Sequence, residues 1–376
     1  MARRGFASVV LVTGYPTFQA RALVERILRD EPSTLVYAVV KGALADEART
    51  AREALSREET NRLVLLDGDA AHMDLGLSGK ELREVSGEVD RIHHAAAITY
   101  LGADRKLAES VNVGGTREIL EVAGLCSGLR VLVHHSTAFV SGDRRGLVRE
   151  DELAVGQGFR NVIEETRARA EKLVVEARAR LPIAVVRPSL VVGDSTSGEI
   201  DRLDGPYLLV LLILSSPADL ALPLPGRGDV PLHLVPVDHV AAVAHLVGRD
   251  GASSGRTYHV VDPEPLTAME AFGLVARAGG RRGPRAFLPA NLTRTLLHTP
   301  GLDRLLKSPR TFVEQLVTDV RYDRTNTERL LAGTRIQCPP FDSYVERLVH
   351  YVKARVEDER EKKRHDADSD VEDPLS

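Results

Sequence analysis

The stretch VVLVTGYPTFQA, residues 9–20, joins a short apolar run to a tight turn and then to a segment with helical spacing. A buried strand that ends in a glycine turn and feeds a helix brings backbone N–H groups and the positive end of the helix dipole to one point. Such a point binds an anion of the size and charge of a pyrophosphate. The stretch therefore predicts the first strand and helix of a nucleotide-binding α/β sheet.

The rest of the first half repeats this alternation of apolar runs and helical segments. Continuous apolar strands between helices are typical of a parallel sheet that is covered on both faces, so the fold class is α/β with a doubly wound, Rossmann-like sheet. Six strands fit the two-halved dinucleotide-binding topology. We expect strands at 9–12, 35–40, 63–66, 91–97, 131–134 and 183–186, and helices at 19–29, 44–59, 78–86, 104–123 and 161–180.

Proline and glycine become frequent after Pro188, where short strands (232–235, 257–261) mix with helices (238–248, 268–277). This texture predicts a smaller C-terminal α/β substrate domain, with segments that rejoin the sheet. We place a dinucleotide-binding domain at 1–190, the substrate domain at 191–355 and a disordered charged tail at 356–376.

The composition is that of an ordinary globular protein of 376 residues with a net charge of −4, which favours no nucleic-acid partner. Two cysteines are too few for a disulfide framework, and we expect a cytoplasmic protein. The longest apolar run, 207–214, is shorter than the ~20 residues of a membrane span. We interpret it as a buried helix, with an acyl-pocket wall or a membrane-dipping face as alternatives. We expect no metal site, because His93-His94 and His134-His135 are adjacent pairs whose members point to opposite faces of a strand.

Within the first turn, the spacing GxxGxxG or GxxGxxA is occupied by Gly14, Thr17 and Ala20. Ala20 is small enough for close helix packing. Thr17 stands where the backbone should approach the phosphates most closely, and its side chain is expected to crowd a bound dinucleotide.

Further motifs follow in order: Gly68-Asp69 after the third strand, His94-Ala95-Ala96-Ala97 after the fourth, VNVGGT at 111–116, HSTAFV at 135–140 and RPSLVVG at 187–193. Together they resemble the extended short-chain dehydrogenase/reductase family, in the branch of the thioester reductase domains and fatty acyl-CoA reductases. The resemblance covers roughly residues 7–350. It implies a nicotinamide dinucleotide, NADPH or possibly NADH, held by Thr13, Gly14, Tyr15, Pro16, Thr17, Phe18, Lys41, Asp69, Ala96, Ala97, Arg167 and Pro188. Lys41 would favour the 2′-phosphate of NADPH. Alternatively, Lys41 is simply a solvent-exposed residue at the end of the second strand.

The same resemblance implies a catalytic Tyr with a Lys four residues later, and a Ser or Thr that binds the substrate oxygen. Thr137 fills the Ser/Thr position, but Ile163 stands at the Tyr position and Arg167 at the Lys position. Isoleucine has no proton to give, and arginine remains protonated at neutral pH. Loss of a positioned general acid costs ~10²–10⁴ in rate. Tyr100 follows the fourth strand but has no Lys one helical turn away.

Two functions follow. The chain is a catalytically impaired relative that serves as a nucleotide sensor or protein-binding scaffold; this is the hypothesis we favour. Alternatively, it is an active NADPH-dependent reductase of an acyl thioester or another carbonyl compound. Whether it is an enzyme stays open at this point.

Overall fold

The computed structural model describes residues 5–369, except 101, 204–205, 219–220, 222, 226–227, 286 and 289–317. The chain packs as two units. The first comprises Met1–Val192, His233–Pro265 and Val317–Cys338, and the second comprises Gly193–Leu232, Leu266–Leu316 and Pro339–Ser376.

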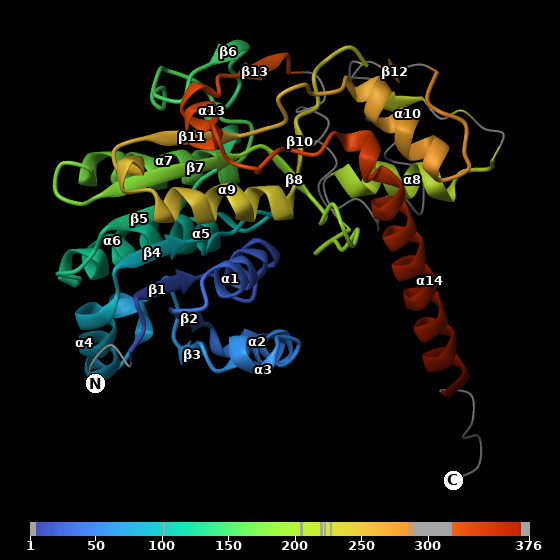
Figure 1. The fold of residues 1–376 in the computed structure, drawn as a ribbon. Helices are drawn as coiled ribbons and strands as arrows, with labels where there is room; N and C mark the ends of the chain where they lie inside the picture. Colours follow the sequence, from blue (N-terminus) through green and yellow to red (C-terminus); the bar gives the residue numbers. More distant parts are fainter. Residues whose placement is uncertain are drawn as a thin grey trace. The chain divides into compact units, whose positions relative to one another are not determined.

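The first unit is built on a seven-stranded parallel sheet with the strand order β11-β7-β5-β4-β1-β2-β3 (Figure 1). The order reverses beside β1, as in a doubly wound dinucleotide-binding sheet. The predicted fold class is confirmed. The strands are β1 (Ser8–Thr13), β2 (Thr34–Val40), β3 (Leu63–Asp67), β4 (Arg91–His94), β5 (Val131–His135), β7 (Ile183–Pro188) and β11 (Thr257–Val260).

Alternate residues of the strands enter two separate cores, one on each face of the sheet. In β1, Val10 and Val12 pack with α1 (Phe18–Asp30) and α9 (Val237–Arg249). Val9 and Leu11 pack on the other face, with α4 (Gly79–Glu88), α6 (Gly115–Leu125) and α7 (Val162–Ala177). This period of two explains why the strands read as continuous apolar runs.

Several elements differ from the expected ones. The segment 44–59 is divided into α2 (Ala45–Glu53) and α3 (Arg57–Thr60), because Ser56 starts a new helix with a reciprocal capping box to Glu59. The segment 104–123 contains α5 (Arg105–Ala108), a π-helical stretch η3 (Glu109–Gly114) and then α6. β11 lies in the large sheet beside β7, where it adds a seventh strand to the expected six.

Smaller elements complete the first unit. Two short parallel pairs join β8 to β10 and β6 to β13. The bounds are η1 (Gly42–Leu44), η2 (Met73–Gly76), η4 (Ala138–Ser141), β6 (Gly146–Val148), β8 (Leu190–Val192), β10 (Leu234–Pro236), η5 (Gly251–Ser253), β13 (Val320–Tyr322) and α13 (Thr325–Leu331).

The second unit contains the apolar run as helix α8 (Pro206–Ser215), which packs with α10 (Ala268–Ala278) and α14 (Val345–Ser369). Tyr207, Leu209, Val210 and Ile213 of α8 are buried. This unit also holds η6 (Phe341–Ser343) and the pair β9 (Leu224–Pro225) and β12 (Phe287–Leu288). In the part of the chain that is described, no helix combines the length and the apolar character needed to cross a membrane.

Helix α14 continues through residues 356–369, a stretch for which we expect disorder. Glu, Lys and Arg dominate this stretch, and all three are strong helix formers, so low hydrophobicity alone does not end the helix. The rest of the expected tail, 370–376, lies outside the described residues.

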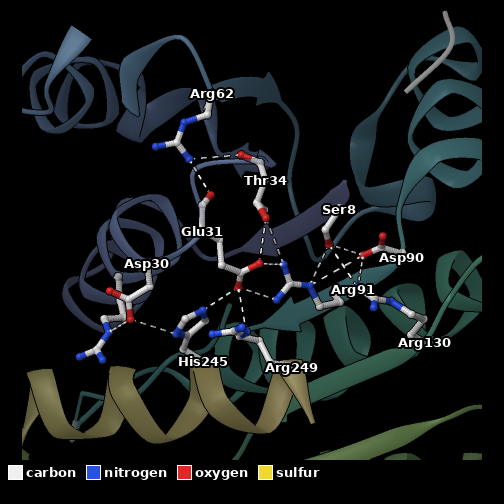
Figure 2. A network of polar contacts seen from close by, with 11 residues as sticks. Ser8, Asp30, Glu31, Thr34, Arg62, Asp90, Arg91, Arg130, His245 and Arg249 are labelled. Carbon is white, nitrogen blue, oxygen red and sulfur yellow. Dashed lines mark hydrogen bonds and ion pairs between the residues drawn. The ribbon is translucent and has the colours of Figure 1, made fainter. Parts of the chain in front are cut away.

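A buried ionic network fastens the amino-terminal edge of the sheet (Figure 2). Arg91, which is 2% exposed, donates to both carboxylate oxygens of Glu31 at 2.8 and 2.5 Å. His245 of α9 approaches Glu31 with its Nε2 at 2.6 Å, and Ser8 donates to Asp90 at 2.7 Å. Glu31 is the C-cap residue of α1, so the network ties α1, α9, β1 and β4 together.

Candidate active site

The site residues that we predict from the sequence lie at the carboxyl ends of the parallel strands. β1 ends at Thr13, β2 at Val40, β4 at His94, β5 at His135 and β7 at Pro188. Parallel strands in one sheet end at a common edge, where open α/β sheets bind their ligands. The site is therefore described strand end by strand end.

The turn after β1 is built around a close backbone approach at Gly14. Its φ is +89°, a conformation that residues with a side chain rarely adopt. A Cβ at Gly14 would lie 2.6 Å from the backbone nitrogen of Ala96 and 2.7 Å from the carbonyl carbon of Ala95. Glycine at this position thus lets the turn close against the Ala95–Ala97 segment.

Thr17 is the N-cap residue of α1 and is exposed. Its φ of −52° is ordinary for any residue, and its side chain makes no cap hydrogen bond. The first N–H groups of α1 therefore remain available to an anion, because an α-helix supplies them no internal partner. The Thr17 side chain causes no backbone strain, so the crowding that we expect from it would affect only a bound dinucleotide.

The side chain of Tyr15 points away from this turn. It is 2% exposed and belongs to the apolar core on the α1 side of the sheet. Burial, with a smaller contribution from Glu25, raises the pKa of its phenol to about 12. Tyr15 can therefore offer a ligand only its backbone, whereas Pro16 and Phe18 are half-buried beside it.

A buried hydrogen-bond chain connects the ends of β1 and β4. Thr116 donates to the carbonyl of Asn112 at 2.7 Å, so its hydroxyl oxygen accepts from Nε2–H of His94 at 3.3 Å. Nδ1 of His94 then accepts from Thr13 at 2.8 Å, and Thr13 accepts from the Ala96 N–H at 3.3 Å. Burial, together with the charge of Arg167, lowers the pKa of His94 to about 3. The ring is thus neutral, as this donor and acceptor pattern requires.

Lys41 and Asp69, nominated separately, form an ion pair of 3.0 Å at the ends of β2 and β3. Asp69 also accepts from the Ala71 N–H at 2.9 Å. Burial tends to raise the pKa of Asp69, but these two donors overcome it, and the pKa is lowered. The Lys41 side chain is 54% exposed, so its ammonium group can still meet a ligand.

Thr137, Arg167 and Pro188 converge at the ends of β5 and β7. Thr137 donates to the Pro188 carbonyl at 3.4 Å and accepts from the Phe139 N–H at 3.3 Å. The Arg167 guanidinium donates to the carbonyl of His135 and is 6% exposed. Burial lowers the pKa of Arg167 to about 10, partly offset by Glu171, so Arg167 is a cation at neutral pH.

Ile163 packs in a small apolar cluster in the first turn of α7. It is 7% exposed, and the cluster consists of Ile98, Tyr100, Ala103, Ala108, Val162 and Ile163. The loop after β4 therefore meets the first turn of α7 through apolar contacts. Tyr100, set aside in the sequence, brings a phenol to this cluster.

Sequence reasoning missed how firmly α7 is anchored. Glu171 accepts from Arg187 at 2.6 Å, with exposures of 0% and 2%, and also from Ser136. Asn112 of η3 bonds the backbone of Ile98 and donates to Thr166 of α7 at 2.9 Å. Two sequence features could have indicated this anchoring: Glu171, four positions after Arg167, and Arg187 at the end of a strand. From the sequence alone, both charged residues are expected at the surface until the helix is placed.

The histidine pairs of β4 and β5 are buried, and His93 Nδ1 lies 3.2 Å from His135 Nε2. Among the described residues, no group of three or more His, Cys, Asp and Glu side chains could hold a metal ion.

The parallel sheet with its glycine turn and strand-end polar groups defines a dinucleotide-binding domain of the extended short-chain reductase class. Residues 12–244 match the family model described as male sterility protein, an NAD-binding family. Since this match covers more than half of the chain, the protein belongs to that family.

Three similar proteins illustrate the relationship. The chain is 26% identical to fatty acyl-CoA reductase wat of Drosophila melanogaster over 61% of this chain and 52% of that protein. It is 28% identical to glycine betaine reductase ATRR of Emericella nidulans over 71% of this chain and 22% of that protein. The chain thus spans about half or less of the length of these relatives. Among solved structures, the terminal R domain of the myxalamid biosynthetic pathway superposes with a TM-score of 0.81 at 25% identity, covering 94% of this chain and 92% of that one. The predicted resemblance is confirmed.

Proposed function

We propose that the protein binds NADPH at the carboxyl edge of its sheet and reduces an acyl thioester. The observation that carries the cofactor half is the turn after β1: Gly14 closes against Ala96, and Thr17 leaves the first N–H groups of α1 uncapped. The bound dinucleotide would supply the hydride. The relatives named as acyl-CoA and betaine reductases, together with the terminal R domain, support the substrate half.

Preference for NADPH rests on the end of β2. An acidic residue in this region selects NAD by binding the ribose 2′-hydroxyl, whereas a cation accommodates the 2′-phosphate. β2 ends at Val40 and is followed by Lys41 and Gly42. Asp69 lowers the charge that Lys41 presents, but the half-exposed ammonium group can turn to a phosphate.

The test compares NADPH and NADH binding to the wild type and to Lys41→Ala by nicotinamide fluorescence. A charge-assisted hydrogen bond contributes ~1.5–3 kcal/mol, so Lys41→Ala should weaken NADPH binding about tenfold or more and leave NADH binding nearly unchanged. Lys80→Ala, an exposed lysine of α4, is the matched control. Equal affinity of the wild type for both dinucleotides would reject the role of Lys41.

A second candidate function is supported by Ile163 and Arg167, which replace the acid and its partner. In that case the chain binds the dinucleotide without turnover and serves as a sensor or as a protein-binding scaffold. The two are separated by incubating the NADPH complex with acetyl-, octanoyl- and palmitoyl-CoA and following nicotinamide absorbance. Oxidation coupled to release of free thiol supports the reductase, and tight NADPH binding without oxidation supports the second candidate.

A further inference from the structure

Two residues with hydroxyl groups, Ser136 and Thr137, follow β5 directly, and their surroundings differ. Thr137 has extended backbone angles, so the two side chains point to opposite faces of the strand end. Ser136 is 2% exposed and donates its hydroxyl proton to the carboxylate of Glu171 in α7. Thr137 is half-buried. The proton of Ser136 is therefore already engaged, and Thr137 is the residue of this pair whose hydroxyl can turn to a substrate.

The hydroxyl of Thr137 is held by long hydrogen bonds. It donates to the Pro188 carbonyl at 3.4 Å and accepts from the Phe139 N–H at 3.3 Å. A normal O–H···O hydrogen bond measures ~2.7–2.8 Å, so the bond to Pro188 is weak. The hydroxyl can exchange it for a bond to a substrate oxygen at little cost. The position of Thr137 must then be set by the residues on either side of it.

Glu171 links the two strand ends that carry this hydrogen bond. β5 and β7 are parallel neighbours in the sheet. The Glu171 carboxylate accepts from Ser136 after β5 and from Arg187 in β7, the latter at 2.6 Å. Ser136 immediately precedes Thr137, and Arg187 immediately precedes Pro188. One carboxylate thus holds the residue before each partner of the bond between Thr137 and Pro188.

Arg187 is also held on the side away from Glu171. Its Nη1 donates to the Glu150 carbonyl at 3.4 Å and to Nε2 of His259 at 3.2 Å. Burial, together with the charge of Arg187, lowers the pKa of His259 to about 3, so the ring is neutral and can accept this bond. Because the guanidinium group is planar and its donors have a fixed geometry, contacts on both sides fix its orientation.

The Glu171–Arg187 pair supplies geometry more than stability. The two side chains are 0% and 2% exposed, and a buried ion pair is often no more stabilising than apolar residues of the same volume, because both charges lose their hydration. Charge-assisted hydrogen bonds do fix distances and directions. A group that binds a reacting oxygen needs this precision, since a displacement of ~1 Å can cost ~10²-fold in rate.

We propose that Ser136, Glu171 and Arg187 are positioning residues that hold the Thr137 hydroxyl where it meets the substrate oxygen. The inference rests on the proposed thioester reduction and adds the residues on which the action of Thr137 depends. In this role the three residues act through Thr137, and none of them exchanges a proton with the substrate.

The test is a double-mutant cycle between Ser136 and Thr137. NADPH oxidation is followed with whichever of the acetyl, octanoyl and palmitoyl thioesters the wild type reduces fastest. Ser136→Ala should lower kcat ~10–10²-fold, with the KM for the thioester and the Kd for NADPH unchanged. Thr137→Ala should lower kcat ~10²–10³-fold. The double variant should be no slower than Thr137→Ala, because Ser136 has no effect once the hydroxyl that it positions is gone.

The matched control is Ser189→Ala. Ser189 follows Pro188 and is 4% exposed, and its hydroxyl has no hydrogen-bond partner in the part of the chain that the structure describes. This variant removes the same atom from a buried serine outside the Glu171 network and should keep the wild-type kcat. Ser136→Cys retains a weak donor and should fall between the wild type and Ser136→Ala. Melting temperatures show that each variant is folded.

Glu171→Gln is the less informative variant, because it leaves the buried charge of Arg187 without its anion and so endangers the fold. A loss of kcat in Ser136→Ala that disappears in the Thr137→Ala background supports the inference. A loss of equal size in both backgrounds, or no loss in either, overturns it and leaves the reductase assignment intact. NADPH binding without oxidation by any of the three thioesters overturns the proposed function, and with it the substrate role of Thr137.

Discussion

Substitution of Gly14 by alanine tests whether the turn after β1 is closed against the loop after β4. Gly14 has a φ of +89°, and a new Cβ would stand 2.6 Å from the Ala96 nitrogen and 2.8 Å from its Cα. The left-handed conformation costs alanine ~1–2 kcal/mol. The contact costs a further ~1–3 kcal/mol, because both partners are backbone atoms that cannot rotate away. The free energy of unfolding should therefore fall by about 2–5 kcal/mol.

The matched control is Gly255→Ala. Gly255 has a φ of +82° in the same unit, and a Cβ added there would meet no atom within 4 Å. This variant bears the backbone cost alone, so the difference between the two variants isolates the contact with Ala96. Urea unfolding followed by circular dichroism gives both values, and NADPH titration should show weakened binding for Gly14→Ala only. A Gly14→Ala variant that is no less stable than Gly255→Ala would refute the close approach.

Two further predictions follow from the described contacts. Thr17→Gly should bind NADPH more tightly while losing only a few tenths of a kcal/mol of stability, since Thr17 makes no cap hydrogen bond; unchanged affinity by fluorescence titration would show that its side chain does not crowd the dinucleotide. Glu31→Gln should lose about 3 kcal/mol at pH 7, at the low end for a broken buried pair because Asp90 still neighbours Arg91. Burial alone would raise the pKa of Glu31, but hydrogen bonds from His245 and Arg91 hold it well below its ordinary value. Because the pKa of Glu31 is lower in the folded protein than its unfolded value near 4.5, the Glu31 carboxylate stabilises the fold above that pH, and this stabilisation is lost as the pH falls. In urea unfolding, the free energy of unfolding should therefore fall less between pH 6 and pH 3 for Glu31→Gln than for the wild type.

The first strands of the sheet could be predicted because β1, β2 and β3 are largely apolar runs that end at glycine or polar residues. The sequence favours the smaller domain for β11, because the strand follows Pro188, after which proline and glycine become frequent. His259 is fully buried nonetheless, since its Nδ1 donates to the Asp323 carbonyl and its Nε2 accepts from Arg187. Both hydrogen-bond partners of the His259 ring lie far from it in the sequence, so no local sequence pattern predicts these bonds.

The same limit applies to the site. The spacing of α7 was sufficient to locate Ile163 and Arg167, because the helix begins where Asn161 caps it with bonds to the Ile163 and Glu164 N–H groups. The pairing of Lys41 with Asp69 depends on which strand ends are neighbours, and the sequence predicts the strands without fixing those side-chain contacts. Likewise, the sequence places His94 at a strand end but does not predict that both of its ring nitrogens form hydrogen bonds.

The contacts around α7 bear directly on how Ile163 should be understood. Asn161 caps the helix, Thr166 is bonded to Asn112, and Glu171 is paired with Arg187 inside the protein. Each of these interactions fixes the helix independently of the side chain at 163, and removing a partner from a buried pair such as Glu171–Arg187 would cost ~3–5 kcal/mol. The side chain at 163 can therefore be exchanged on a helix that these other contacts hold in place.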